Sequence, residues 1–236
     1  MKVLTDLERM RLRHLGYTRV LIVEILLISF LPIYIFIPWL LSLTLVLLCL
    51  VTLVFVSRFS LLRGPENKIY YWLGCSAIFT ELTWRLAFLI GDPLGRLLSP
   101  IHLITWLCFI GITEYRMVRV LSREPSATTR VVMGAVAGYL LIGIGGGILL
   151  NAVWVLHPQA FDLIAMEPTI DKTVLSYRFA PALMASSFAM LSTLGTNIFT
   201  ADLTGRVAGV TIPIVGQLYI VILIGLILGR YNQRSS

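Results

Sequence analysis

A long apolar run near the start of the chain constrains the fold more than any other feature. Between Val20 and Val56 the sequence contains a single charged residue, Glu24. About 20 mostly apolar residues suffice to cross a bilayer, so the run is long enough for two crossings. Lipid requires backbone polar groups to be satisfied internally, and solid apolar runs without alternation favour helices over a β-barrel. The run therefore predicts an all-α membrane protein.

The composition of the whole chain supports this class. Of its 236 residues, 58% are hydrophobic and 13% are charged, whereas a soluble domain of average composition has about 25% charged residues. The apolar runs predict six transmembrane helices, at about 19–37, 38–57, 69–90, 100–118, 130–155 and 207–229.

The net charge of +7 is distributed asymmetrically across these spans. Fourteen basic residues fall on the side of the two termini, four fall on the other side, and Arg85 lies within a span. Such a bias is typical of cytoplasmic loops. We therefore expect a multi-pass protein of a cell membrane, the bacterial inner membrane, with both termini cytoplasmic. The charge then sets orientation and attracts membrane lipid, and we expect no nucleic-acid partner.

Motifs for catalysis or metal binding are lacking in the sequence. His14, His102 and His157 are scattered, without acidic or cysteine partners at ligand spacing, and the three cysteines form no Cys-x-x-Cys pair. Nucleophile elbows, phosphate loops and dinucleotide fingerprints are also missing. We expect neither an enzyme nor a metal site, and no cofactor.

The order of apolar and polar stretches predicts two modules. A polar, proline-containing link separates them, and a glycine cluster at 138–150 follows it; the glycines permit either close helix approach or bending. The predicted divisions are a cytoplasmic or interfacial N-terminus at 1–18, a four-helix sensor-like unit at 19–121, a linker at 122–130 and a two-helix module at 131–231.

Four charged residues lie in or near the apolar spans, namely Glu24, Glu81, Arg85 and Glu114. Charge at membrane depth is costly and usually functional. Glu81 and Arg85 are four residues apart, which places them on one helix face as an ion pair. These residues suit either a voltage sensor or an ion-paired network that fixes helix packing. We favour the network and expect little voltage dependence, because the fourth span has arginines only at its end.

The stretch "SSFAMLSTLGTNIFTAD", residues 186–202, is polar and lies between two very apolar runs. The helical piece at 181–195, which overlaps the first half of this stretch, is long enough for half a crossing but too short for a full one. Irregular backbone at membrane depth is tolerated only where it is buried in protein or lines a watery path. The stretch therefore predicts a re-entrant pore loop.

Two motifs resemble the tetrameric potassium-channel superfamily, and in particular its bacterial six-helix members. The family loop reads "S-F-x-T-L-T-T-L-G-Y-G-D", which Ser187, Phe188 and the run Thr193–Gly195 match. The family inner helix often reads "G-Q-L-Y-x-x-x-L-I", and this chain has "GQLYIVILI" from Gly216. The likeness covers about 130–230 and implies a two-helix pore domain that works as a homotetramer.

The resemblance also implies roles for particular residues. Those implied for the selectivity filter are Thr193, Leu194, Gly195, Thr196 and Asn197. Those implied for the pore helix are Ser187, Phe188 and Ser192. Those implied for the inner helix and its gating are Gly209, Gly216, Gln217 and Gly225, where the glycines serve either as hinges or as close-packing sites.

The filter departs from the family pattern at Thr196 and Asn197, which stand where the family has tyrosine and glycine. Cyclic-nucleotide-gated channels, which pass several cations, are similar to this chain in having a shortened filter. The expected function is a cation channel with weak or altered selectivity for K⁺ and Na⁺. The alternative is a non-conducting relative that acts as a regulatory or assembly subunit. Lipid, pH, membrane tension and a partner remain open as the gating stimulus.

Overall fold

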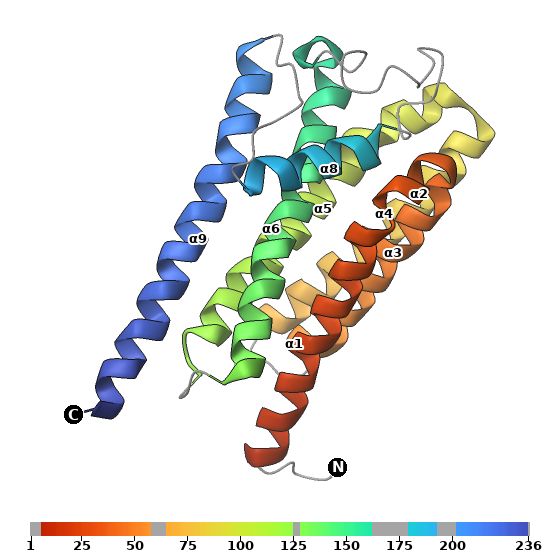
Figure 1. Cartoon of the computed structure of the whole chain (residues 1–236). Coiled ribbons are helices and arrows are strands. Elements are labelled where there is room, and N and C mark those ends of the chain that lie inside the picture. Colours follow the sequence, from red (N-terminus) through yellow and green to blue (C-terminus); the bar gives the residue numbers. More distant parts are fainter. Residues whose placement is uncertain (1–5, 58–64, 125–127, 162–178, 193–201, 236) are drawn as a thin grey trace.

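The computed structural model describes residues 6–57, 65–124, 128–161, 179–192 and 202–235 (Figure 1). Within these ranges all regular elements are helices, which confirms the all-α class. In chain order they are α1 (Asp6–Ser29), α2 (Leu31–Phe36), α3 (Pro38–Thr52), η1 (Leu53–Ser57), α4 (Pro65–Ile90), α5 (Asp92–Leu121), α6 (Thr129–Leu156), η2 (Pro158–Ala160), α8 (Ala180–Leu191) and α9 (Leu203–Ser235).

Among the described residues, four helices are long and apolar enough to cross a membrane. They are α3 continued into η1, α5, α6 and α9. The helix α8 is apolar but has only 12 residues, which is too short for a crossing. Charged residues within α1 and α4 lower their apolar character. A membrane protein is thus supported, while the count of six spans, with α1 and α4 included, stays a prediction.

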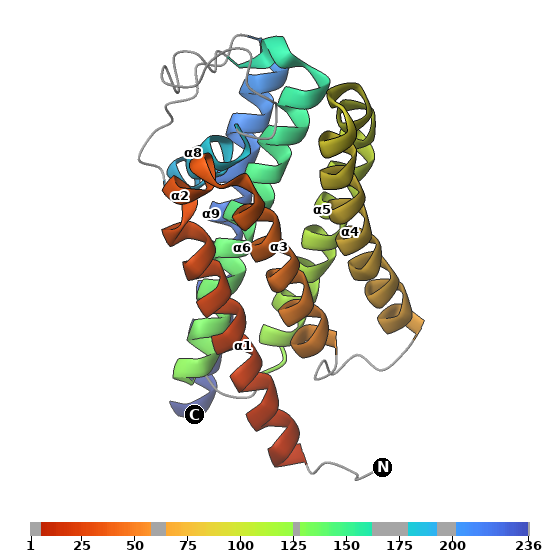
Figure 2. The same cartoon turned by 90° about the vertical axis from the view of Figure 1, so that its right-hand side faces the viewer.

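The long helices run side by side along one direction in both views (Figures 1 and 2). The beginning of α1 and the end of α9 lie at the same end of the molecule. An even number of crossings places the two ends in this way. Their cytoplasmic location stays a prediction.

The helix α6 lies at the centre and packs against α1, α5, α8 and α9. In its apolar segment 67% of the residues are buried, compared with 22% in α9. Glycine and alanine supply many of its buried positions, and small residues let neighbouring helices approach closely. The small residues of α6 therefore suit its place as the central helix against which α1, α5, α8 and α9 pack.

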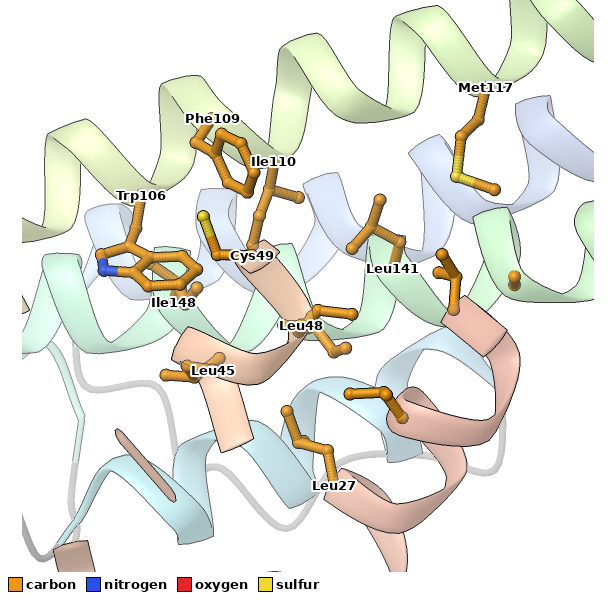
Figure 3. Packing of buried hydrophobic residues seen from close by; sticks show 14 of the residues in the cluster. Leu27, Leu45, Leu48, Cys49, Trp106, Phe109, Ile110, Met117, Leu141 and Ile148 are labelled. Carbon is orange, nitrogen blue, oxygen red and sulfur yellow. The ribbon is translucent and has the colours of Figure 1, made fainter. Parts of the chain in front are cut away.

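The main hydrophobic core joins the N-terminal helices to α6 (Figure 3). Leu27 of α1, Leu48 of α3 and Phe109 of α5 share it with Leu141 of α6, and Met184 of α8 also belongs to it. The link between α5 and α6 falls close to the predicted linker, with α5 ending at Leu121. Because the core continues across that link, the two predicted modules are packed together as one body.

The proline-rich stretch between the first two apolar runs contains a short helix. The helix α1 continues from Asp6 through the predicted interfacial segment but ends at Ser29. The six-residue α2 follows, and a break at Ile37 precedes α3. Pro32 and Pro38 stand in the first turns of α2 and α3, where a missing backbone donor leaves no hydrogen bond unmade. The prolines thus start two helices.

Candidate functional site

The short helix α8 lies on the glycine-rich middle of α6 and also contacts α9 and α2. Figure 1 shows it running across the long helices. A Cβ atom on Gly147 would lie 2.7 Å from the Met184 Cα, closer than real Cβ atoms come. Gly143 is in similarly close contact with the Phe188 ring. The glycine cluster of α6 therefore permits close approach of α8.

Two hydrogen bonds tie α8 to α6. The Ser187 hydroxyl, which is completely buried, donates to the Gly143 carbonyl oxygen at 2.7 Å. Gly146 leaves the room that this hydroxyl occupies. The Tyr139 hydroxyl donates to the Leu191 carbonyl oxygen at 2.8 Å, at the last residue of α8. Both the middle and the end of the short helix are thereby fixed.

The segment after α8 contains the predicted filter. The helix ends at Leu191, and the exposed Ser192 follows, with its hydroxyl donating to the Ala189 carbonyl oxygen at 3.0 Å. Thr193, Leu194, Gly195, Thr196 and Asn197 lie outside the described residues. Of the three predicted pore-helix residues, Ser187 and Phe188 thus lie against α6, and Ser192 marks the exposed end.

The predicted gating residues of α9 have different surroundings. Gly216 is in close contact with the Leu191 side chain of α8, so it acts as a packing site. Gly209 lies at ordinary contact distance from α8, and Gly225 has no described neighbour within 4 Å. Gln217 is exposed. Of the three glycines, only Gly216 is therefore required for close packing within one chain.

Glu81, Arg85 and His102 form a buried group that we call the paired cluster. The Arg85 Nε lies 3.9 Å from the Glu81 Oε1, and the His102 Nε2 lies 3.4 Å from the Glu81 Oε2. Arg85 also donates to the Ser42 hydroxyl at 2.5 Å and to the Pro38 carbonyl oxygen at 2.7 Å. The cluster balances opposite charges and joins α3, α4 and α5.

His102 is the member of this cluster that sequence reasoning missed. Its ring stacks on that of Trp84 with centroids 4.6 Å apart, and the Trp84 indole donates to the Ser99 hydroxyl at 2.8 Å. The pairing of α4 with α5 brings His102 to Glu81, and no spacing in the sequence signals it. The described residues contain no group of three or more metal-ligating side chains.

A small cavity connects the paired cluster to the C-terminal helices. Its volume is about 30 Å³, and its lining includes His102, Asn151 of α6 and Met184 of α8. The cluster thus borders the surface on which α8 lies.

Glu24, Glu114 and Tyr219 form a second buried group that we call the acid site. Glu24 is completely buried, and neither carboxyl has a hydrogen-bond partner or ion pair among the described residues. The Tyr219 hydroxyl donates to the Ala135 carbonyl oxygen at 2.9 Å. The four intramembrane charges named from the sequence therefore fall into two separate groups, of which only the paired cluster contains a basic residue.

Arg116, near the end of α5, faces the start of α4. Arg116 donates to the Asn67 side-chain oxygen at 2.5 Å, and its guanidinium lies 4.5 Å from the centre of the Tyr70 ring. These contacts hold Arg116 at the helix ends. The weak voltage dependence expected from the sequence stays a prediction.

Comparisons with known proteins place the chain in no family. No protein-family model matches it, and no curated protein or solved structure does.

Proposed function

We propose that this protein is a homotetrameric cation channel whose filter, at Thr193–Asn197, passes K⁺ and Na⁺ with weak or altered selectivity. In this proposal α1, α3, α4, α5, α6 and α9 are the six spans. The helix α8 enters the membrane part-way, and the chain returns through the filter to α9. Ions move passively, and no covalent chemistry takes place.

The observation that carries the proposal is the fixed position of α8 between two long apolar helices. It is too short to cross a membrane, yet two hydrogen bonds hold it on the glycines of α6. It ends two residues before Thr193. A filter needs such a rigid support, because its backbone carbonyls must replace the water shell of an ion at fixed positions.

The exposed surface of α9 supports a tetramer. Gln217 is an exposed polar side chain within the apolar middle of α9, at about 212–225. Burying such an amide in lipid without a hydrogen bond is unfavourable by about 2–7 kcal/mol. Facing a watery pore or a neighbouring copy removes this penalty. One chain also contributes only one pore loop, so a central filter requires several copies.

Ion flux from purified protein in liposomes tests the proposal. We expect K⁺ and Na⁺ to pass at comparable rates, and flux to fall strongly in Ser187→Ala, which loses the buried bond to α6. Ser186→Ala is the matched control, because its hydroxyl donates within α8 to the Ala182 carbonyl oxygen. High selectivity for K⁺ would contradict the proposed filter, and a monomeric protein would contradict the pore.

The departures at Thr196 and Asn197 favour a second candidate, a non-conducting subunit that keeps the channel architecture. Absence of flux from a tetrameric wild type would support it. The double substitution Thr196→Tyr with Asn197→Gly restores the family pattern. A gain of K⁺ flux in that variant would show that the scaffold is competent and the natural filter is silent.

A further inference from the structure

The acid site lies where four helices meet. Glu24 comes from α1, Glu114 from α5 and Tyr219 from α9, and the two carboxyls are near enough to interact electrostatically. Gly138 of α6 faces Glu114 and Tyr219. A Cβ on Gly138 would lie 3.2 Å from the Glu114 Oε1 and in direct contact with the Tyr219 hydroxyl. The site therefore joins the N-terminal helices to α9.

Charge makes this site unusual within the molecule. An ionised carboxylate removed from water is strongly unfavourable unless a cation or several donors compensate it, and a second carboxylate nearby adds repulsion. The paired cluster meets this requirement through Arg85 and His102. Glu24 and Glu114 have no such partner among the described residues. Some positive species must accompany them.

The hydrogen bonding of Tyr219 leaves the carboxyls without its proton. Its hydroxyl proton is already donated to the Ala135 carbonyl oxygen, so only its lone pairs remain available. A carboxylate is an acceptor as well, and two acceptors form no hydrogen bond. The Glu114 carboxyl has no hydrogen-bond partner among the described residues, so it receives no proton from Tyr219. Tyr219 therefore supplies neither a positive charge nor a donor that would stabilise an anionic Glu114.

The site suits a metal cation poorly. Ca²⁺ takes about six to eight oxygen ligands, and Mg²⁺ demands near-ideal octahedral geometry. The site offers the carboxyls of Glu24 and Glu114, and the described residues contain no group of three metal-ligating side chains. A proton needs no coordination shell and fits a buried pair.

The other groups near the pair do not replace the missing positive charge. Tyr17 of α1 interacts with Tyr219 and carries no positive charge. Arg19 of α1 lies over the Phe55 ring. Arg116 of α5 contacts Asn67 and Tyr70 of α4. The helix α3 and η1 have no charged residue, and Cys49 of α3 donates to the Gly74 carbonyl oxygen of α4. The basic residue of α6, Arg130, stands in its first turn.

We propose that Glu24 and Glu114 form an intramembrane proton-binding site whose occupancy controls how α9 packs against α6. With the proton bound, the pair is compact and α9 rests on Gly138. With the proton released, two adjacent anions repel each other and require water, so the contact of Tyr219 with α6 loosens. Proton binding is independent of the proposed channel, whereas its effect on gating rests on that proposed function.

Infrared spectroscopy of the full chain in lipid nanodiscs tests the binding step directly. We expect the wild type at neutral pH to show the carbonyl band of a protonated carboxylic acid. The band should weaken in each of Glu24→Gln and Glu114→Gln and disappear in the double variant. Glu81→Gln is the matched control and should leave the band unchanged. A wild type without the band, or a double variant that keeps it, would overturn the proposal.

Thermal unfolding gives a second readout. A buried site that keeps a proton which the unfolded chain releases makes the folded state less stable as pH rises. The unfolding temperature of the wild type should therefore fall on raising the pH, and the double Gln variant should lose that dependence. Melting that depends on Na⁺ or K⁺ concentration instead would assign the site to a metal cation and refute the proton.

The gating consequence is measured separately. Flux should change with pH in the wild type and become independent of pH in the double Gln variant. If the protein conducts and its flux still depends on pH in the double Gln variant, the proposed control of α9 by this site is refuted. A protein that never conducts would refute the channel while leaving the infrared result to decide on the proton.

Discussion

The paired cluster and the acid site solve the same physical problem in different ways. Both place carboxyl groups among apolar helices. In the paired cluster Glu81 has Arg85 and His102 beside it. In the acid site Glu24 and Glu114 have no hydrogen-bond or ion-pair partner among the described residues. The first arrangement compensates charge with charge and belongs to α3, α4 and α5, whereas the second requires a proton and reaches α9.

The two groups differ in whether their protonation can change. A buried ion pair with additional hydrogen bonds is locked, because removing either partner leaves an uncompensated charge. A pair of carboxyls that depends on a proton can respond to its surroundings. The paired cluster therefore suits a fixed support, and the acid site suits a switch at the helix that we propose to line the pore.

Removing the cation of the paired cluster should have the largest effect. Arg85→Met leaves Glu81 with His102 alone and abolishes the bonds to Ser42 and the Pro38 carbonyl. Breaking a buried pair in this way destabilises by about 3–5 kcal/mol. Thermal unfolding in detergent should show a large loss, smaller in Arg85→Lys, which keeps the charge. Equal stability of wild type and Arg85→Met would mean that the pairing is incidental.

Crowding the acid site should have the next largest effect. Gly138→Ala drives a methyl group into Tyr219 and Glu114, and overpacking of this kind destabilises by about 1–3 kcal/mol. Gly111→Ala is the matched control, because nothing described lies within 4 Å of its added Cβ. The two unfolding temperatures should differ clearly. Similar values would show that α9 does not rest on Gly138.

Neutralising one acid in each region should change the stability of the protein in opposite directions. Glu114→Gln removes a charge that has no partner, so its stability at high pH should equal or exceed that of the wild type. Glu81→Gln instead leaves Arg85 uncompensated and should destabilise at every pH between about 6 and 8. Parallel pH series of thermal unfolding compare them. A loss of the same size in both variants would erase the contrast between the two regions.

Removing single hydroxyl groups should have the smallest effect. Tyr219→Phe loses the bond to the Ala135 carbonyl, and Tyr139→Phe loses the bond to the Leu191 carbonyl. Each loss costs about 0.5–1.5 kcal/mol. Tyr219→Phe should also shift the pH dependence of unfolding, since the Tyr219 hydroxyl and the Glu114 carboxyl both lie beside Gly138 and its loss makes the acid site less polar, while Tyr139→Phe should not. Identical pH profiles would separate Tyr219 from the acid site.

Much of the local organisation followed from the sequence. The half-length helix predicted at 181–195 corresponds to α8, and the link predicted at 122–130 separates α5 from α6. Glu81 and Arg85 were placed on one face by their spacing, because residues four apart are neighbours on a helix. The short α2 was missed, since a proline pair signals equally a turn and the start of a helix.

The amino-acid sequence by itself determined the all-α membrane class, because long apolar runs leave helices as the way to satisfy the backbone in lipid. It also determined the presence of a short apolar helix before the polar Thr193–Asn197 string. Only the tertiary structure decided that the glycines of α6 receive α8, that His102 joins Glu81, and that Glu24 comes within electrostatic range of Glu114. These contacts join helices far apart in the chain, and helix periodicity reports only which residues share a face, not which face of another helix they meet.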